Sequence, residues 1–217
     1  MGNENTSLSA RILAHVGSLP YFTIENLKIL GVPPYHLRIV LSRLSERGDI
    51  LRLKKGLYAS KEYIEKVKIN DIYSTYLEFI ATKIYEPSYI SLEYVLYEHN
   101  VLTDVPINYT LITRNKTYNN TNDLGTFLYH KIKDDIFYGY CIKKTNDFVY
   151  GKASGVKALF DFLYLRRKLL MTAQMLNELR LNLDVYNRKD WTELRKYVIR
   201  TGSKKMNQIY HWLKQHD

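Results

Sequence analysis

The sequence predicts an α+β protein in two parts, with short helices and a hairpin first and a mixed α/β segment after them. Three observations lead to this prediction. Apolar residues recur at helical spacing over about the first 48 residues. Short aromatic and β-branched runs, which are typical of strands, follow between residues 87 and 150, and helical periodicity returns after residue 155. The chain has 217 residues, enough for two small domains, which we expect at 1–68 and 69–217.

Two short helices begin the first part. Leu8, Ile12 and Val16 are spaced so that they share one helical face, which predicts a helix that buries this face. A second short helix is expected at 22–31, where Gly31 is a suitable residue for a C-terminal stop.

A third helix is expected from Pro33-Pro34 to Gly48. Proline suits the first turn of a helix, because its missing N–H would have no helical partner there. Apolar residues at i, i+3, i+4 and i+7 then form a stripe that we expect to be buried. They are Leu37, Val40, Leu41 and Leu44. The opposite face carries Tyr35, His36, Arg38, Ser42 and Arg43.

A tight hairpin with a basic tip is expected at 50–59. Three short helices followed by such a hairpin indicate a winged helix-turn-helix, whose third helix can enter the major groove while the hairpin lies against the backbone. The alternative is a winged helix that only contacts protein. The candidate DNA-binding residues are Tyr35, His36, Arg38, Ser42, Arg43, Arg52, Lys54 and Lys55.

The second part is predicted to hold a small sheet and C-terminal helices. A connector at 61–70 and a helix at 71–84 lead to strand-like runs at 109–112, 126–129, 136–140 and 148–150, with a polar turn at 119–123. Helices are expected at 155–165, 172–181, 190–200 and 203–215. In the first of them, Ala158, Phe162 and Leu165 form the core stripe. Lys157 and Asp161 form an i, i+4 pair on another face. The basic residue comes first, which is the less favourable order, so we expect the pair to contribute little to helix stability.

The charge is concentrated at the two ends of the chain. The formal net charge is +10, made up of +4 over residues 1–60, −2 over 61–150 and +8 over 151–217. A balance of this kind favours an anionic partner, such as nucleic acid or an acidic protein. A second basic surface is therefore expected on the last two helices, against the alternative of a solvated basic face. Its residues are Arg195, Lys196, Arg200, Lys204 and Lys205.

Several classes of protein are disfavoured. There is no glycine-rich phosphate loop, no Gly-x-Ser-x-Gly and no His-Glu-x-x-His, so we expect no enzyme, no catalytic residue and no cofactor. One cysteine and scattered histidines give no basis for a metal site. With neither an early apolar run nor a stretch long enough to span a bilayer, we expect a cytoplasmic protein without membrane contact. A nuclease using Glu78, Glu93, Asp104 and Lys143 remains as an alternative that no spacing supports.

Three stretches of the second part resemble the AbiEi family of type IV toxin–antitoxin antitoxins. Pro87-Ser88-Tyr89-Ile90-Ser91-Leu92-Glu93 is similar to a family element. Leu124-Gly125-Thr126-Phe127-Leu128-Tyr129 with Phe137-Tyr138-Gly139-Tyr140 resembles the stretch that follows it. Ala153-Ser154-Gly155-Val156-Lys157-Ala158-Leu159-Phe160-Asp161-Phe162-Leu163-Tyr164-Leu165 resembles a family helix. Their order, with the winged helix in front, also matches that of the family.

The resemblance implies a DNA-binding repressor that acts as an antitoxin. The first domain would bind inverted repeats in its own promoter, as a cooperating pair of monomers or as a dimer. The second would counteract a nucleotidyltransferase-like toxin, and direct contact with that toxin is not required. The alternative is a winged-helix module for protein or RNA interaction without toxin antagonism. The shared motifs are mostly apolar or aromatic, so no catalytic role is carried over to them.

Overall fold

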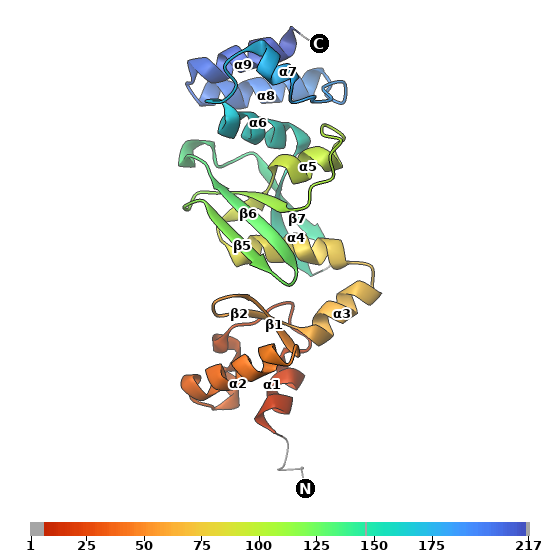
Figure 1. The fold of residues 1–217 in the computed structure, drawn as a ribbon, viewed down its shortest axis with the longest axis vertical. Coiled ribbons are helices and arrows are strands. Elements are labelled where there is room, and N and C mark those ends of the chain that lie inside the picture. The colour runs from red at the N-terminus through yellow and green to blue at the C-terminus, as the bar shows by residue number, and fades with distance from the viewer. Residues whose placement is uncertain (1–6, 146, 216–217) are drawn as a thin grey trace. The chain divides into compact units, whose positions relative to one another are not determined.

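The computed structural model describes residues 7–145 and 147–215, and these form two compact units (Figure 1). The first unit extends to Ile80 and includes Asn120–Gly125. The second comprises Ala81–Asn119 and the chain from Thr126 onward. The fold is α+β, as predicted, with helices and a short strand pair first and a larger sheet with C-terminal helices after them. The division into functional domains at 68/69 stays a prediction.

The helices of the first unit follow the sequence signals closely. Helix α1 spans Leu8–Val16, and the Ser7 side chain caps it by accepting from the Ala10 N–H. The second helix is a 3₁₀ helix, η1 (Ile24–Leu30), and it ends at Gly31 with a φ of 68°. Helix α2 spans Pro34–Glu46 with proline at its first position.

The hairpin of the first unit is the predicted wing. Strands β1 (Ile50–Lys54) and β2 (Leu57–Ser60) pair antiparallel. Phe22 forms an isolated antiparallel β-bridge with Tyr58 of β2, because its N–H and C=O both bond to the Tyr58 backbone. One apolar core holds the three helices and the first residue of β1 together. Its buried members are Ile12, Val16, Phe22, Leu27, Leu37, Val40, Leu41, Leu44 and Ile50.

Two helices follow the wing. Helix α3 spans Lys61–Ile69, and the Ser60 side chain caps it. Helix α4 spans Tyr73–Ile84, so the helix expected at 71–84 is present, and the connector expected at 61–70 is itself a helix.

Within the described residues, a six-stranded sheet has the order β5-β6-β4-β3-β8-β7. The β3–β4 and β7–β8 pairs are antiparallel, whereas β3–β8 and β4–β6 are parallel. The strands are β3 (Ser88–Ile90), β4 (Tyr109–Thr113), β5 (Tyr118–Asn122), β6 (Gly125–Lys131), β7 (Tyr140–Thr145) and β8 (Phe148–Ala153).

Two expectations for this sheet were wrong. The polar stretch at 119–123 is mostly strand β5 and not a turn, because pairing with β6 outweighs the low strand propensity of asparagine. The run at 136–140 is not a strand. A 3₁₀ turn, η2 (Asp134–Ile136), precedes Gly139, which has a φ of 80°, and β7 begins only at Tyr140.

Helices α5 to α9 of the second unit lie in successive layers on one side of the sheet (Figure 1). Helix α5 (Leu92–Glu98) packs beside α6 (Gly155–Arg166), and α7 (Ala173–Asn177), α8 (Arg188–Arg200) and α9 (Lys204–Lys214) follow. The helix expected at 172–181 is shorter, because the chain turns after Asn177 and Arg180 has a φ of 49°.

The Lys157–Asp161 pair on α6 was misjudged as a weak pair. Both side chains are completely buried, and Lys157 Nζ lies 2.6 Å from Asp161 Oδ1. The other carboxylate oxygen accepts hydrogen bonds from Tyr89 and Ser91, and Lys157 also donates to the Ile136 carbonyl. Burial raises the pKa of Asp161 and lowers the pKa of Lys157, and their mutual attraction opposes both shifts. The pair joins α6 to strand β3 and to η2.

Candidate nucleic-acid interface

Helix α2 presents its predicted polar face to solvent. Leu37, Val40, Leu41 and Leu44 are buried. Because each residue turns the helix by about 100°, the positions directly opposite this stripe are those of Tyr35, Ile39, Ser42 and Glu46. All four are exposed, and Tyr35 has 67% of its surface accessible. A helix with an exposed face of this kind can enter the major groove of DNA, which is wide enough to admit it.

The wing places basic side chains beside this helix. Its turn lies at Lys55-Gly56, where Gly56 has a φ of 82°. Residues other than glycine rarely adopt this backbone conformation. Arg52 and Lys55 are exposed, whereas Lys54 is half-buried. Lys55, which lies in the turn, is therefore more accessible to a ligand than Lys54 is.

A groove of about 460 Å³ lies between α2 and the wing. Four of the eight predicted residues come together in it, namely Arg38, Ser42, Arg52 and Lys55. Three of these four are cations, so the groove is suited to a phosphate backbone.

The other predicted residues do not line this groove. Tyr35 and His36 stack on each other at the start of α2, with ring centroids 6.3 Å apart. Arg43 is five residues beyond Arg38 and so lies about 140° away around the helix axis. His36 and Arg43 therefore occupy the flank of α2 opposite the wing side, and Lys54 lies at the end of β1.

The structure also adds residues that the sequence interpretation missed. Ile24, Ser45, Glu46 and Tyr58 line the groove, and Ile39 is 48% exposed on α2. The Ser42 hydroxyl donates to Glu46 Oε1 at 3.1 Å. The i, i+4 spacing of Ser42 and Glu46 could have indicated this contact. The presence of Tyr58 in the groove could be recognised only from the three-dimensional position of the hairpin.

Two residues of the predicted second basic surface contact the rest of the fold, although one of them, Arg200, is exposed. Arg200 donates to the Asp135 carbonyl and lies over the Tyr138 ring. Lys205 donates to the Met171 carbonyl and lies over the Trp212 ring. Arg195, Lys196 and Lys204 are exposed. The five residues therefore do not act alike, because two of them are already engaged within the fold.

Arg195 belongs to a different group from the one expected. It lines a hollow of about 420 Å³ on α8 and α9, together with two further cations and an aromatic cluster. The lining residues are Tyr186, Arg188, Trp191, Thr192, Arg195, Tyr210 and Lys214. Tyr186 and Tyr210 each meet Trp191 edge-on, with ring centroids 6.2 Å apart. The hollow is thus a rigid aromatic surface bordered by positive charge.

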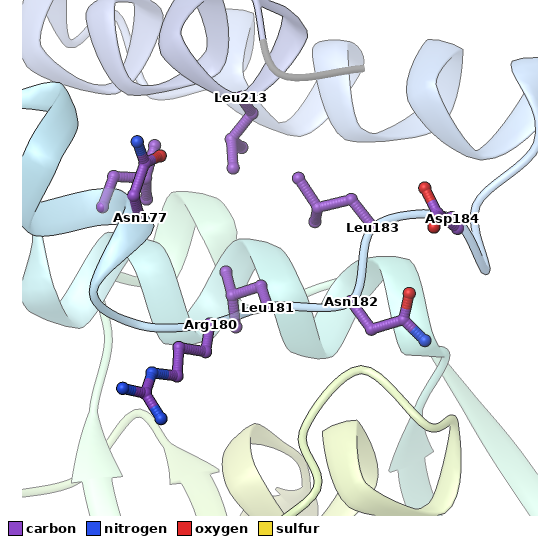
Figure 2. Close-up of a pocket in the computed structure, with 8 residues that line it drawn as sticks. Asn177, Arg180, Leu181, Asn182, Leu183, Asp184 and Leu213 are labelled. Carbon is purple, nitrogen blue, oxygen red and sulfur yellow. The ribbon is translucent and has the colours of Figure 1, made fainter.

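A smaller hollow of about 250 Å³ lies beside α7 and the loop that follows it. Figure 2 shows Leu183 and Leu213 directed toward each other across the hollow, while Arg180 points away from it. Four of its eight lining residues are leucines, and it brings together no nucleophile and base.

No set of three or more metal-ligating side chains is found in residues 7–145 and 147–215. The four residues of the nuclease alternative differ from one another in their environments. Glu78 is buried on α4, Glu93 forms an ion pair with Arg166, and Asp104 and Lys143 are exposed. No helix in this part of the chain is long and apolar enough to cross a membrane.

The fold is that of a winged helix-turn-helix, and three cations line the groove between its third helix and its wing. The family model described as "Transcriptional regulator, AbiEi antitoxin" matches residues 11–61, which run from α1 to the start of α3. The match confirms the predicted family over this segment and indicates a DNA-binding transcriptional regulator of a toxin–antitoxin system. The motifs between Pro87 and Leu165 lie outside the matched residues. No curated protein matches the chain.

Proposed function

We propose that this protein is a DNA-binding repressor that acts as the antitoxin of a type IV toxin–antitoxin system. Residues 1–68 would bind the operator, and residues 69–217 would counteract a nucleotidyltransferase-like toxin. The observation that carries the proposal is the groove between α2 and the wing. Arg38, Arg52 and Lys55 meet there, within the segment that matches the regulator family.

In the proposed complex, α2 enters the major groove and the wing lies on the adjacent backbone. Arg38 is placed to donate two hydrogen bonds to a guanine, and Ile39 can contact a thymine methyl group. Lys55 and Arg52 neutralise phosphates, which contributes affinity without sequence preference. Tyr35, His36, Arg43 and Lys54 contact the flanking backbone. The operator would contain inverted repeats, and one copy of α2 would bind each repeat. The protein would act in the cytoplasm.

The α8–α9 surface favours a second anionic contact in the second domain. Neither Arg188 nor Arg195 forms an ion pair among the described residues, and both border the aromatic hollow. This observation also supports the second candidate function, in which the C-terminal domain binds an acidic protein or RNA and the winged helix only supports it.

One experiment separates repression from antitoxin activity. The full chain is expressed with the gene adjacent to its own, beside a reporter under its upstream region. We expect the wild type to repress the reporter and to relieve growth arrest. Arg38→Ala combined with Arg52→Ala should lose repression and still relieve the arrest, because toxin antagonism is assigned to the other domain. Repression retained in this variant would refute the assigned DNA surface. Growth arrest that the wild type cannot relieve would refute the antitoxin role.

A further inference from the structure

Glu46, the last residue of α2, is an acidic residue among the cations that line the groove between α2 and the wing. It lies on the exposed face of α2 and lines the same groove as Arg38, Arg52 and Lys55. In the described part of the chain it forms no ion pair with these cations. Its hydrogen bond from Ser42 uses Oε1, which leaves Oε2 available to a ligand.

A carboxylate on a DNA-facing helix is unfavourable unless a base donates to it, because phosphates repel it. The four bases differ in what they offer in the major groove. Cytosine offers an N4 amino donor, guanine offers two acceptors, and thymine offers an acceptor and a methyl group. Adenine offers an N6 amino donor next to the N7 acceptor, and N7 would repel the second oxygen of a carboxylate that accepts from N6. A fixed carboxylate therefore selects cytosine.

We propose that Glu46 determines sequence specificity by accepting a hydrogen bond from the N4 amino group of a cytosine in the operator. This inference rests on the proposed DNA-binding function. Ser42 positions the carboxylate through its hydrogen bond to Oε1. The residues Arg38, Ser42 and Glu46 follow one another at i, i+4 and i+8, so they form one stripe along α2.

The stripe also gives a spacing for the operator. Glu46 is eight positions beyond Arg38, which corresponds to about 12 Å along the helix. A strand of DNA rises by about 3.4 Å per nucleotide. A helix that follows the major groove would therefore read a guanine with Arg38 and a cytosine with Glu46 about three to four base pairs apart in each half-site.

The test is selection of binding sites from a pool of randomised duplex DNA with the full chain. Glu46→Gln keeps the size of the side chain and its acceptor for Ser42, but glutamine pairs bidentately with adenine. We expect the wild type to prefer cytosine at one position by about tenfold and Glu46→Gln to prefer adenine there. The control is Glu65→Gln on α3, which removes the same charge from an exposed residue and should leave the preference at cytosine.

The other outcomes each overturn the inference. If Glu46→Gln binds all sequences more tightly and alike, Glu46 acts only through its charge. If Glu46→Gln and Glu65→Gln both select the wild-type sequence, Glu46 does not contact a base. Wild-type binding without any base preference would reject the assigned role of Glu46 while leaving DNA binding intact. No wild-type binding to any duplex would reject the proposed function as well.

Discussion

Replacing Lys157 with methionine would leave a buried charge without its partner. The Lys157 and Asp161 side chains are completely buried, and Asp161 would keep only the hydrogen bonds from Tyr89 and Ser91. Removing one member of a buried ion pair costs about 3–5 kcal/mol of stability. With a urea dependence of about 1–3 kcal/mol per molar, we expect the unfolding midpoint of the second unit to fall by roughly 1–5 M.

Tryptophan fluorescence is the appropriate assay, because Trp191 and Trp212, the two tryptophans of the chain, both lie in the second unit. The matched control is Lys83→Met, whose ammonium lies 2.7 Å from the exposed carboxylate of Glu86. The Lys83 side chain is 25% accessible and that of Glu86 is 59% accessible, and an ion pair that solvent reaches contributes about 0–1 kcal/mol. If Lys157→Met shifts the midpoint no more than Lys83→Met does, the buried pair does not stabilise the unit as described.

Further predictions concern the two basic surfaces. Arg38→Ala should weaken binding to the preferred operator by about 1–3 kcal/mol, and Lys55→Ala should weaken all sequences alike and lower the salt slope by about one, as measured in fluorescence anisotropy titrations. Gly56→Ala should cost about 1–3 kcal/mol of stability, because its φ of 82° disfavours a side chain, and thermal unfolding by circular dichroism would show it. Arg195→Ala should weaken binding of an anionic partner without loss of stability, whereas Arg200→Ala should lower stability, because Arg200 is held by a carbonyl and a tyrosine ring. Equal effects of the last two variants on stability would contradict the division of that surface.

The elements that the sequence predicted well are those with local signals. Helix α2 has proline at its first position, an apolar stripe of period 3.6 and Gly48 after its end, and the structure follows all three. The wing was predicted as a tight hairpin with a basic tip at 50–59, and strands β1 and β2 form it. In these segments, the local preference and the tertiary contacts favour the same conformation.

The features that the sequence did not predict depend on distant contacts. Strand β5 is rich in asparagine and forms because β6 pairs with it. The Lys157–Asp161 pair is buried because strand β3 and η2 supply its other hydrogen-bond partners. Glu46 joins the candidate site because the wing lies next to the end of α2. None of these placements follows from the spacing of residues along one element.

Binding of the full chain to its own upstream DNA tests the central claim most directly. Anisotropy titrations would compare this duplex with a scrambled one at two salt concentrations, using the wild type and a variant with Arg38, Arg52 and Lys55 all replaced by alanine. We expect the wild type to prefer the upstream duplex and to bind more weakly at the higher salt concentration. The triple variant should lose this binding. If the triple variant binds the upstream duplex as tightly as the wild type, the groove between α2 and the wing is not the DNA-binding surface.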